Sequence, residues 1–392
     1  MFSQMNYENG KKTGKQCADS IAENIRVFFR TAEAAGYSEE AIHIQAEFMK
    51  KDLSPSRYEE VRGIAEGAKV DFGRLLAYNL LQQKILPEGC TVFFAAGSSS
   101  STGATIIGKN SDKGGDELFT GKNCYKLHEI NVVSYFENED GSHIVGVSAA
   151  GTTGIKMGLN SHGVAAATNF GYSSEIKRKS LSTEDKFAGD RAQIARDALQ
   201  HKTALEAAQY AASRLIARPM ASSGILEFAD ADEVYIVENA YEYVAVNKIT
   251  NAVDSRSNYF VTLDKLNEPG NASCYCRYHR SQKMLAEVEG HVTVDDLKQI
   301  SMDHHDGTGS VGICRHLDGI QSSTQSSAIM ELNREHPEKS LIHVALGKPC
   351  NAWRNEDGHV TISMDMKREE LPEEFLCGEP YKKYCMAEPI FN

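Results

Sequence analysis

A cysteine that follows a glycine at the start of an expected strand is the residue most able to do chemistry in this chain. Cys90 comes directly after Gly89, and residues 91–96, which are β-branched and aromatic, follow it. If the bond between Gly89 and Cys90 were cut, Cys90 would carry both a thiol nucleophile and an α-amino group with a pKa of about 7.7–8.0, which suits a general base. The pattern therefore predicts a chain that cuts itself to release a catalytic N-terminal cysteine.

The thiol of Cys90 can perform this cut itself. Attack on the carbonyl carbon of Gly89 would form a thioester, and water would then release the amino group of Cys90. Glycine removes steric obstruction and permits a strained backbone at that point. We expect fragments 1–89 and 90–392 that stay associated. A lone Gly-Cys pair also has a simpler interpretation, because free cysteines are commonly small buried residues.

The residues after Cys90 predict a β-hairpin that carries Asp112 toward it. Residues 97–103 form a polar, serine-rich turn, and residues 104–108 are apolar again. Cys90 would lie at the start of the first strand, and Asp112 just past the end of the second. A carboxylate there can orient the amine and the thiol, although Asp also favours turns at strand ends.

The elements that must position these residues predict an α+β fold. The first 89 residues have helical periodicity, with helix start signals at Ser38 and Ser54. Helices are expected at 71–83, at 184–215 with a break at Lys202-Thr203, at 276–289 and at 294–304. Strands are expected at 131–136, 143–148, 163–167, 224–228, 233–238, 243–246, 327–332, 341–346 and 359–364. This order favours layers with largely antiparallel sheets, and the absence of a Pro-rich or Gly-Ser linker favours one domain, residues 1–392.

Composition excludes several classes of partner. The chain has 392 residues, of which 41% are hydrophobic and 24% charged, as in a soluble globular enzyme. Its net charge of -12 opposes binding to nucleic acid or to an anionic membrane. The N-terminus lacks the pattern of a signal peptide, and no uncharged stretch approaches the roughly 20 residues that span a bilayer. We therefore expect a cytoplasmic protein.

The cysteines and histidines do not predict a metal site. Nine scattered cysteines in a chain of this length indicate reduced thiols. The groups considered as ligands are Cys274-Tyr-Cys276 with His279, and His304-His305-Asp306 with His316. Neither group has the ligand spacing of a known zinc motif, so we interpret the second as polar loop residues. No metal or other cofactor is predicted.

Several segments that follow one another along the chain carry a resemblance. They are Arg62-Gly-Ile-Ala-Glu-Gly-Ala-Lys-Val-Asp-Phe, Glu88-Gly-Cys-Thr with Gly108-Lys-Asn-Ser-Asp, Gly158-Leu-Asn-Ser-His-Gly-Val-Ala-Ala-Ala-Thr-Asn-Phe, Ser257-Asn-Tyr-Phe, Arg277-Tyr-His-Arg, and Val311-Gly-Ile-Cys-Arg-His. Together they resemble the penicillin acyltransferase family of autoproteolytic cysteine N-terminal-nucleophile hydrolases, a group related to bile-salt hydrolases and penicillin V acylases. Tyr259 stands where the family has His, and Gly312 where Ser is usual.

The resemblance implies a role for each matching residue. Cys90 would be the nucleophile and, through its freed amine, the base, and Asp112 would accept hydrogen bonds from that amine or thiol. Asn258 and Asn169 would donate side-chain N–H groups to the oxyanion of the tetrahedral intermediate. As turn-forming residues, both Asn side chains also have a purely structural interpretation.

The resemblance also implies an arginine that faces the nucleophile. Arg315 matches it and could pair with Asp112 or with a substrate carboxylate, while Arg277 competes for the same role and an exposed position is the ordinary alternative. Lys109 stands where bile-salt hydrolases have an arginine three residues before the hairpin aspartate, which keeps the charge but loses the planar fork.

The implied fold is a four-layer αββα sandwich, and the implied activity is that of an amidase or acyltransferase. Its partners would be a small N-acyl amine, amide or acyl-thioester substrate and its own cleaved N-terminal fragment. The sequence leaves open which substrate is used, whether the acyl group passes to water or to an amine, and whether the chain forms a homo-oligomer. Two rival hypotheses are an uncleaved, inert binding relative and a thiol hydrolase that pairs Cys90 with one of the thirteen histidines.

Overall fold

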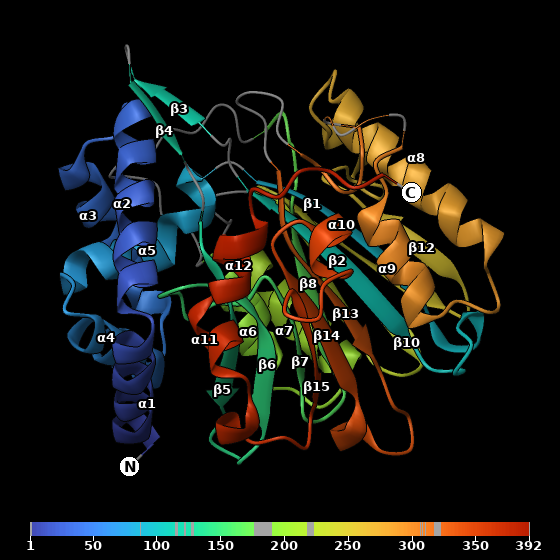
Figure 1. Ribbon diagram of the computed structural model, residues 1–392, viewed down its shortest axis with the longest axis horizontal. Coiled ribbons are helices and arrows are strands. Elements are labelled where there is room, and N and C mark those ends of the chain that lie inside the picture. The colour runs from blue at the N-terminus through green and yellow to red at the C-terminus, as the bar shows by residue number, and fades with distance from the viewer. Residues whose placement is uncertain are drawn as a thin grey trace.

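The computed structural model describes residues 2–86, 88–113, 117–120, 123–126, 129–175, 190–217, 223–305, 307, 309, 311–316 and 323–391. Within these ranges, two large antiparallel sheets lie face to face between helical layers (Figure 1). The expected α+β fold, a four-layer αββα sandwich, is confirmed by this arrangement.

The first sheet carries both residues of the predicted hairpin. Its strand order is β12-β1-β2-β13-β14-β15, and neighbouring strands are antiparallel. Its strands are β1 (Glu88–Ala95), β2 (Ile106–Lys113), β12 (Val253–Arg256), β13 (Ser323–Glu331), β14 (Leu341–Leu346) and β15 (His359–Ser363).

The second sheet has the order β11-β10-β9-β8-β7-β6-β5, a meander in which consecutive strands pair. Its strands are β5 (Asn131–Glu137), β6 (His143–Ala149), β7 (Met157–Asn160), β8 (Ala165–Phe170), β9 (Gly224–Ala229), β10 (Glu233–Ala240) and β11 (Tyr243–Thr250). A separate short pair joins β3 (Glu117–Thr120) and β4 (Asn123–Lys126).

Helices cover the outer faces of both sheets. The first sheet packs against α8 (Ala272–Glu287), α9 (Val294–Met302) and α10 (Pro349–Ala352), and the second against α6 (Arg191–Ala198) and α7 (Ala204–Ala217). Near the C-terminus follow α11 (Glu373–Cys377) and α12 (Glu379–Tyr384). In the part of the chain that is described, no helix has the length and apolar character needed to cross a membrane.

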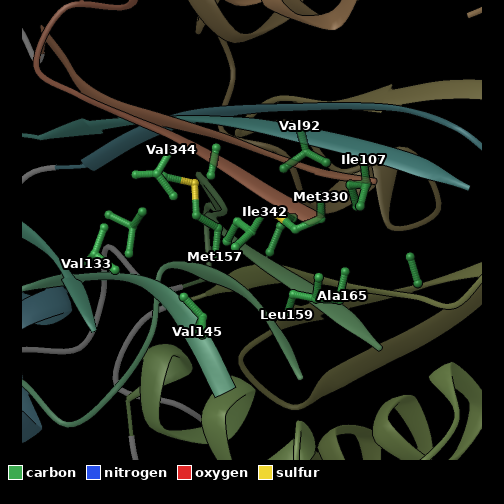
Figure 2. Close-up of a cluster of buried hydrophobic side chains, with 14 of the residues drawn as sticks. Val92, Ile107, Val133, Val145, Met157, Leu159, Ala165, Met330, Ile342 and Val344 are labelled. Atoms are coloured by element: carbon green, nitrogen blue, oxygen red, sulfur yellow. The ribbon is translucent and has the colours of Figure 1, made fainter. Parts of the chain in front are cut away.

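The central core lies between the two sheets, as Figure 2 shows. Aliphatic side chains of the first sheet meet those of the second because alternate residues of each strand face inward. The labelled members are Val92, Ile107, Met330, Ile342 and Val344 from the first sheet, and Val133, Val145, Met157, Leu159 and Ala165 from the second. This alternation fixes which hairpin residues point into the sandwich and which point outward.

The N-terminal helices form a bundle beside the sandwich, drawn in blue in Figure 1. They are α1 (Phe2–Gln16), α2 (Ala18–Ala34), α3 (Glu39–Met49), α4 (Pro55–Ala68) and α5 (Phe72–Ile85). Ser38 and Ser54 cap α3 and α4 through hydrogen bonds to backbone N–H groups, as their sequence signals predicted. The apolar core of the bundle includes Val132 and Ala149 of the second sheet, so residues 2–86 pack onto the sandwich.

Most expected elements are present, but several boundaries differ. The predicted strands of the hairpin are too short: Cys90 and Asp112 both lie inside the paired β1–β2 ladder, not at its margins. Neither β7 nor β12 was expected from the sequence. The expected helical stretch 184–215 is confirmed as α6 and α7 with the break at Lys202-Thr203, while its first residues, 184–189, lie outside the described ranges.

Candidate active site

The β1–β2 ladder sets the orientation of Cys90. Gly89 lies opposite Asp112, and Cys90 lies opposite Ser111. Side chains alternate along β1, so Cys90 points to the same side of the first sheet as Val92, toward the second sheet. Only 3% of Cys90 is exposed. By the same alternation Asp112 lies on the outer face of β2, which α8 and α9 cover.

Asn258, just after β12, holds the main-chain nitrogen of Cys90. The Cys90 N–H donates to Asn258 Oδ1 at 2.9 Å, and Asn258 Nδ2 donates to the carbonyl oxygen of Phe170 at 2.7 Å. The orientation of this amide follows from its partners, because its oxygen meets donors and its nitrogen meets an acceptor. Cleavage before Cys90 would turn the nitrogen that Asn258 holds into the α-amino group.

Arg277, on α8, holds the other side of Cys90. Its guanidinium donates to the carbonyl oxygen of Cys90, to Thr91 Oγ1 at 2.9 Å and to Asn258 Oδ1 at 2.7 Å. It also lies 3.9 Å from a carboxylate oxygen of Asp112, and the residue is 1% exposed. The planar fork of arginine allows these simultaneous contacts.

Asp112 lies next to Arg277 on the outer face of the first sheet and so joins the cluster formed by Cys90, Asn258 and Arg277. It accepts a hydrogen bond from Thr324 Oγ1 at 2.8 Å, and Arg315 lies 3.5 Å away. Burial lowers the pKa of Arg315, whereas the charge of Asp112 raises it. Of the two arginines considered for the position that faces the nucleophile, Arg277 contacts Cys90, because α8 packs directly on β1, while Arg315 contacts Asp112, one of the partners expected for it.

Asn169, on β8, supports the segment that carries Asn258. Its Nδ2 donates to the carbonyl oxygens of Arg256 at 3.1 Å and Ser257 at 3.0 Å, which occupies both of its N–H groups. These contacts are structural, and the proposed donation from Asn169 to an oxyanion would require them to break. Asn258 Nδ2 uses only one of its two N–H groups, in the hydrogen bond to the carbonyl oxygen of Phe170. Its second N–H is therefore a better candidate than Asn169 for the donor to the oxyanion.

Lys109 lies apart from this cluster. Lys109 pairs with Val92 in the β1–β2 ladder, whereas Cys90 pairs with Ser111, so Lys109 lies two residues along the ladder from Cys90. The residue is 1% exposed. Its ammonium donates to the carbonyl oxygens of Lys156, at 3.0 Å, and Thr168. Lys109 thus ties the first sheet to the second and is placed for a structural contact.

A buried carboxylate shares the interior with Lys109. Burial raises the pKa of Glu227 to about 8, although Lys109 and Arg256 lower it. Neither carboxylate oxygen of Glu227 has a hydrogen-bond partner among the described residues, which agrees with a group that is hard to ionise.

Three further residues belong to the surroundings of Cys90, and the sequence reasoning missed them. Thr324 orients Asp112, and Cys274 lies with its sulfur 3.5 Å from Arg277. Burial raises the pKa of Tyr172 to about 12, with smaller effects from Cys274, Arg277, Arg315 and Cys90. Cys274 could have been found from its position one helical turn before Arg277. Thr324 and Tyr172 carry no signal of this kind in the sequence.

Comparisons with known proteins give low-similarity matches. The chain matches no protein-family model, and no curated protein matches it by sequence. An N-acylethanolamine-hydrolyzing acid amidase ortholog of Caenorhabditis elegans is 14% identical with a TM-score of 0.39, over 62% of this chain and 92% of that one. A mutant of the conjugated bile acid hydrolase of Clostridium perfringens is 12% identical with a TM-score of 0.42, over 71% and 93%. Penicillin V acylase of Agrobacterium tumefaciens is 13% identical with a TM-score of 0.37, over 66% and 83%. Values of this size do not establish a shared activity.

Proposed function

We propose that this protein is a self-cleaving N-terminal-cysteine hydrolase or acyltransferase that acts on the amide or thioester bond of a small N-acyl compound. The resemblance to the penicillin acyltransferase family implies this activity. The observation that supports it most directly is the hydrogen bond from the main-chain nitrogen of Cys90 to Asn258 Oδ1. That contact already holds the atom that self-cleavage would turn into the catalytic amine.

Maturation begins with the thiol of Cys90. The sulfur attacks the carbonyl carbon of Gly89, and the C–N bond breaks as the nitrogen of Cys90 takes a proton, which leaves a thioester between the two residues. Water then hydrolyses the thioester, so residue 89 gains a carboxylate and the thiol is restored. Asn258 and Arg277 hold the nitrogen and the carbonyl oxygen of Cys90 on either side, so this residue keeps its place when the chain is cut.

Turnover uses the same atoms. The free amine of Cys90 takes the thiol proton, the sulfur attacks the substrate carbonyl, and the second N–H of Asn258 stabilises the oxyanion, an interaction worth about 2.7–4 kcal/mol per donor. The ammonium of Cys90 then protonates the leaving amine, and an acyl-thioester remains. Water or an acceptor amine releases the acyl group. Asp112 offsets part of the positive charge of Arg277 and Arg315, which helps to keep Arg277 in place.

A covalent trapping experiment tests this function. Cleaved protein is mixed with N-acyl p-nitroanilides of short, medium and long acyl chains, and intact masses are recorded during turnover. We expect nitroaniline release together with one acyl adduct on fragment 90–392, both lost in Cys90→Ala and both kept in Cys276→Ala, which removes a half-buried thiol outside the contacts of Cys90.

Other outcomes would favour the rival hypotheses. Turnover by an uncut chain that is lost on changing a single histidine would identify a Cys-His thiol hydrolase. A folded chain that is neither cut nor acylated by any of these substrates would indicate an inert binding relative.

A further inference from the structure

A second group of reactive side chains lies on the outer side of the first sheet, away from the contacts of Cys90. Its members are His304, Cys314, His316 and Cys350. Each offers one nitrogen or sulfur atom, and these four atoms all lie within 4.8 Å of one another. The two cysteines are 0% exposed and the histidines 6% and 8%. We call this group the Cys-His cluster.

The dimensions of the Cys-His cluster are close to those of a tetrahedral metal site. His316 Nε2 lies 3.2 Å from Cys350 Sγ and 3.7 Å from Cys314 Sγ. A zinc ion with Zn–S bonds of about 2.3 Å and Zn–N bonds of about 2.0–2.1 Å holds its ligand atoms about 3.3–3.8 Å apart. Shifts of about 1 Å would therefore bring all four atoms to bonding distance.

The fold brings three separate segments to this point. His304 follows the end of α9, Cys314 and His316 lie in residues 311–316, and Cys350 lies in α10. The main chain fixes the first two segments together, because the carbonyl oxygen of Asp303 accepts hydrogen bonds from the N–H groups of Ile313 and Cys314 at 2.9 and 2.8 Å. The site does not depend on flexible surface groups.

The chemistry of the Cys-His cluster is unusual for a protein interior. Thiols are weak hydrogen-bond partners, and two imidazoles beside two thiols leave strong polar groups poorly satisfied. His304 Nε2 is buried and has no hydrogen-bond partner among the described residues. Two thiolates and two neutral imidazoles around a divalent cation give a neutral, fully satisfied unit, which can be buried at low cost.

We propose that the Cys-His cluster binds one divalent metal ion of the zinc type as a closed structural site. Binding would release the two thiol protons to solvent, with no redox step. Four protein ligands leave no open position, so the ion would have no role in chemistry on substrate. The expectation that these histidines are ordinary loop residues rested on their spacing in the sequence; Asp306, which was grouped with them, lies outside the described residues.

The site would also position part of the candidate active site. Arg315 lies between the ligands Cys314 and His316, and its side chain reaches Asp112. A bound ion would fix residues 311–316 to α10 and thereby hold Arg315 in place. This inference stands on its own geometry and does not need the proposed function to be correct.

Metal analysis tests the proposal on the full chain. Protein is purified without chelator, dialysed with zinc and then without it, and its metal content is measured by plasma mass spectrometry. We expect one zinc ion per chain in the wild type and in Cys385→Ser, a buried thiol outside the cluster. Cys350→Ser should bind zinc at least about 100-fold more weakly. Replacement by Co2+ should give the visible absorption bands of a tetrahedral site with thiolate ligands.

Wild-type protein alone can overturn the proposal if the variants fail to fold. Removal of zinc with a strong chelator should lower the unfolding temperature and make two more thiols reactive, and zinc should restore both values. Folded wild-type protein that holds no metal after zinc dialysis would contradict the proposal. A disulfide between Cys314 and Cys350, identified by mass spectrometry of the linked peptides, would also contradict it, as would equal zinc binding by Cys350→Ser and the wild type.

Discussion

Asn258 and Arg277 hold the two main-chain polar groups of Cys90, one at its nitrogen and one at its carbonyl oxygen. The sequence indicated Asn258 as a hydrogen-bond donor to substrate, yet its oxygen is the atom that contacts Cys90. Because this oxygen also accepts from Arg277, the three residues form one unit. Changes at Asn258 and Arg277 should therefore affect both self-cleavage and turnover.

Asn258→Ala should slow both reactions. The substitution removes the acceptor for the nitrogen of Cys90 and the candidate donor to the oxyanion, so we expect kcat to fall by about 10²–10³. Cleavage rates come from gel densitometry and kcat from nitroanilide release by the cleaved fraction. Asn247→Ala, at an exposed site on β11, is the control and should match the wild type. Unchanged kcat in Asn258→Ala would exclude the proposed role.

Arg277→Lys and Arg315→Lys should differ in severity. Lysine keeps the charge but cannot make the several contacts of Arg277 with Cys90, Thr91 and Asn258. We expect kcat to fall by about tenfold or more in Arg277→Lys and by less in Arg315→Lys, whose contact is with Asp112. Steady-state kinetics of both variants decide the order. A larger loss in Arg315→Lys would return to Arg315 the role that the family resemblance implied.

Glu227 should make stability depend on pH. Burial raises its pKa from 4.5 to about 8, so the folded state keeps the proton while the unfolded state loses it above pH 4.5. The folded state then binds more protons, and this contribution to stability, complete below pH 4.5, is lost as the pH rises to about 8. In Glu227→Gln this pH dependence should disappear, with a difference of about 2–4 kcal/mol between pH 5 and 8.

Urea unfolding of the uncleavable Cys90→Ala chain measures this effect without the complication of two fragments. Glu242→Gln, at an exposed site, serves as the matched control and should keep the wild-type dependence. Parallel stability profiles for Glu227→Gln and its parent across this pH range would contradict the raised pKa.

At the scale of elements, hydrophobic periodicity predicted the long helices and most strands of both sheets, but it missed β7 and β12. It placed the ends of β1 and β2 wrongly because Asn110, Ser111 and Asp112 are poor strand formers, and pairing with β13 keeps them in the ladder. That difference matters, since the register puts Cys90 and Asp112 on opposite faces. The roles of Arg277 and Arg315 depend on how α8 and residues 311–316 pack on the first sheet, which a single sequence does not encode locally.

The contact between α1 and α4 gives a prediction at this scale. Gly63 of α4 lies so close to α1 that an added Cβ would be 2.0 Å from the carbonyl oxygen of Tyr7. Gly63→Ala must push the helices apart, and we expect a loss of about 1–3 kcal/mol in the free energy of unfolding. Gly73→Ala in α5 meets only side-chain atoms at 3.3 Å or more, so it should be neutral or slightly stabilising. Equal effects of the two substitutions would contradict the close packing.

At the scale of the whole molecule, the helical bundle is built into the sandwich. Asn24 of α2 donates to the carbonyl oxygens of Ile130 and Ala150 at 3.0 and 3.1 Å, and Tyr78 of α5 donates to the buried Glu129 at 2.7 Å. Separation of the bundle would expose its apolar core and leave these groups without partners.

The fragments should therefore stay together after cleavage. Size-exclusion chromatography and native mass spectrometry of cut protein should show fragments 1–89 and 90–392 as one complex, which separates only in denaturant. Elution of a folded, active fragment 90–392 on its own would contradict this prediction.

The central claim is self-cleavage at Gly89-Cys90, and the denatured intact mass of freshly purified protein tests it most directly. Wild-type protein should give two masses, with N-terminal sequencing of the larger fragment reading Cys90-Thr-Val-Phe, while Cys90→Ala should stay whole. Incubation at several pH values before measurement separates slow maturation from none. A wild-type chain that stays uncut under all of them, or a Cys90→Ala chain that is cut at the same bond, would contradict the account.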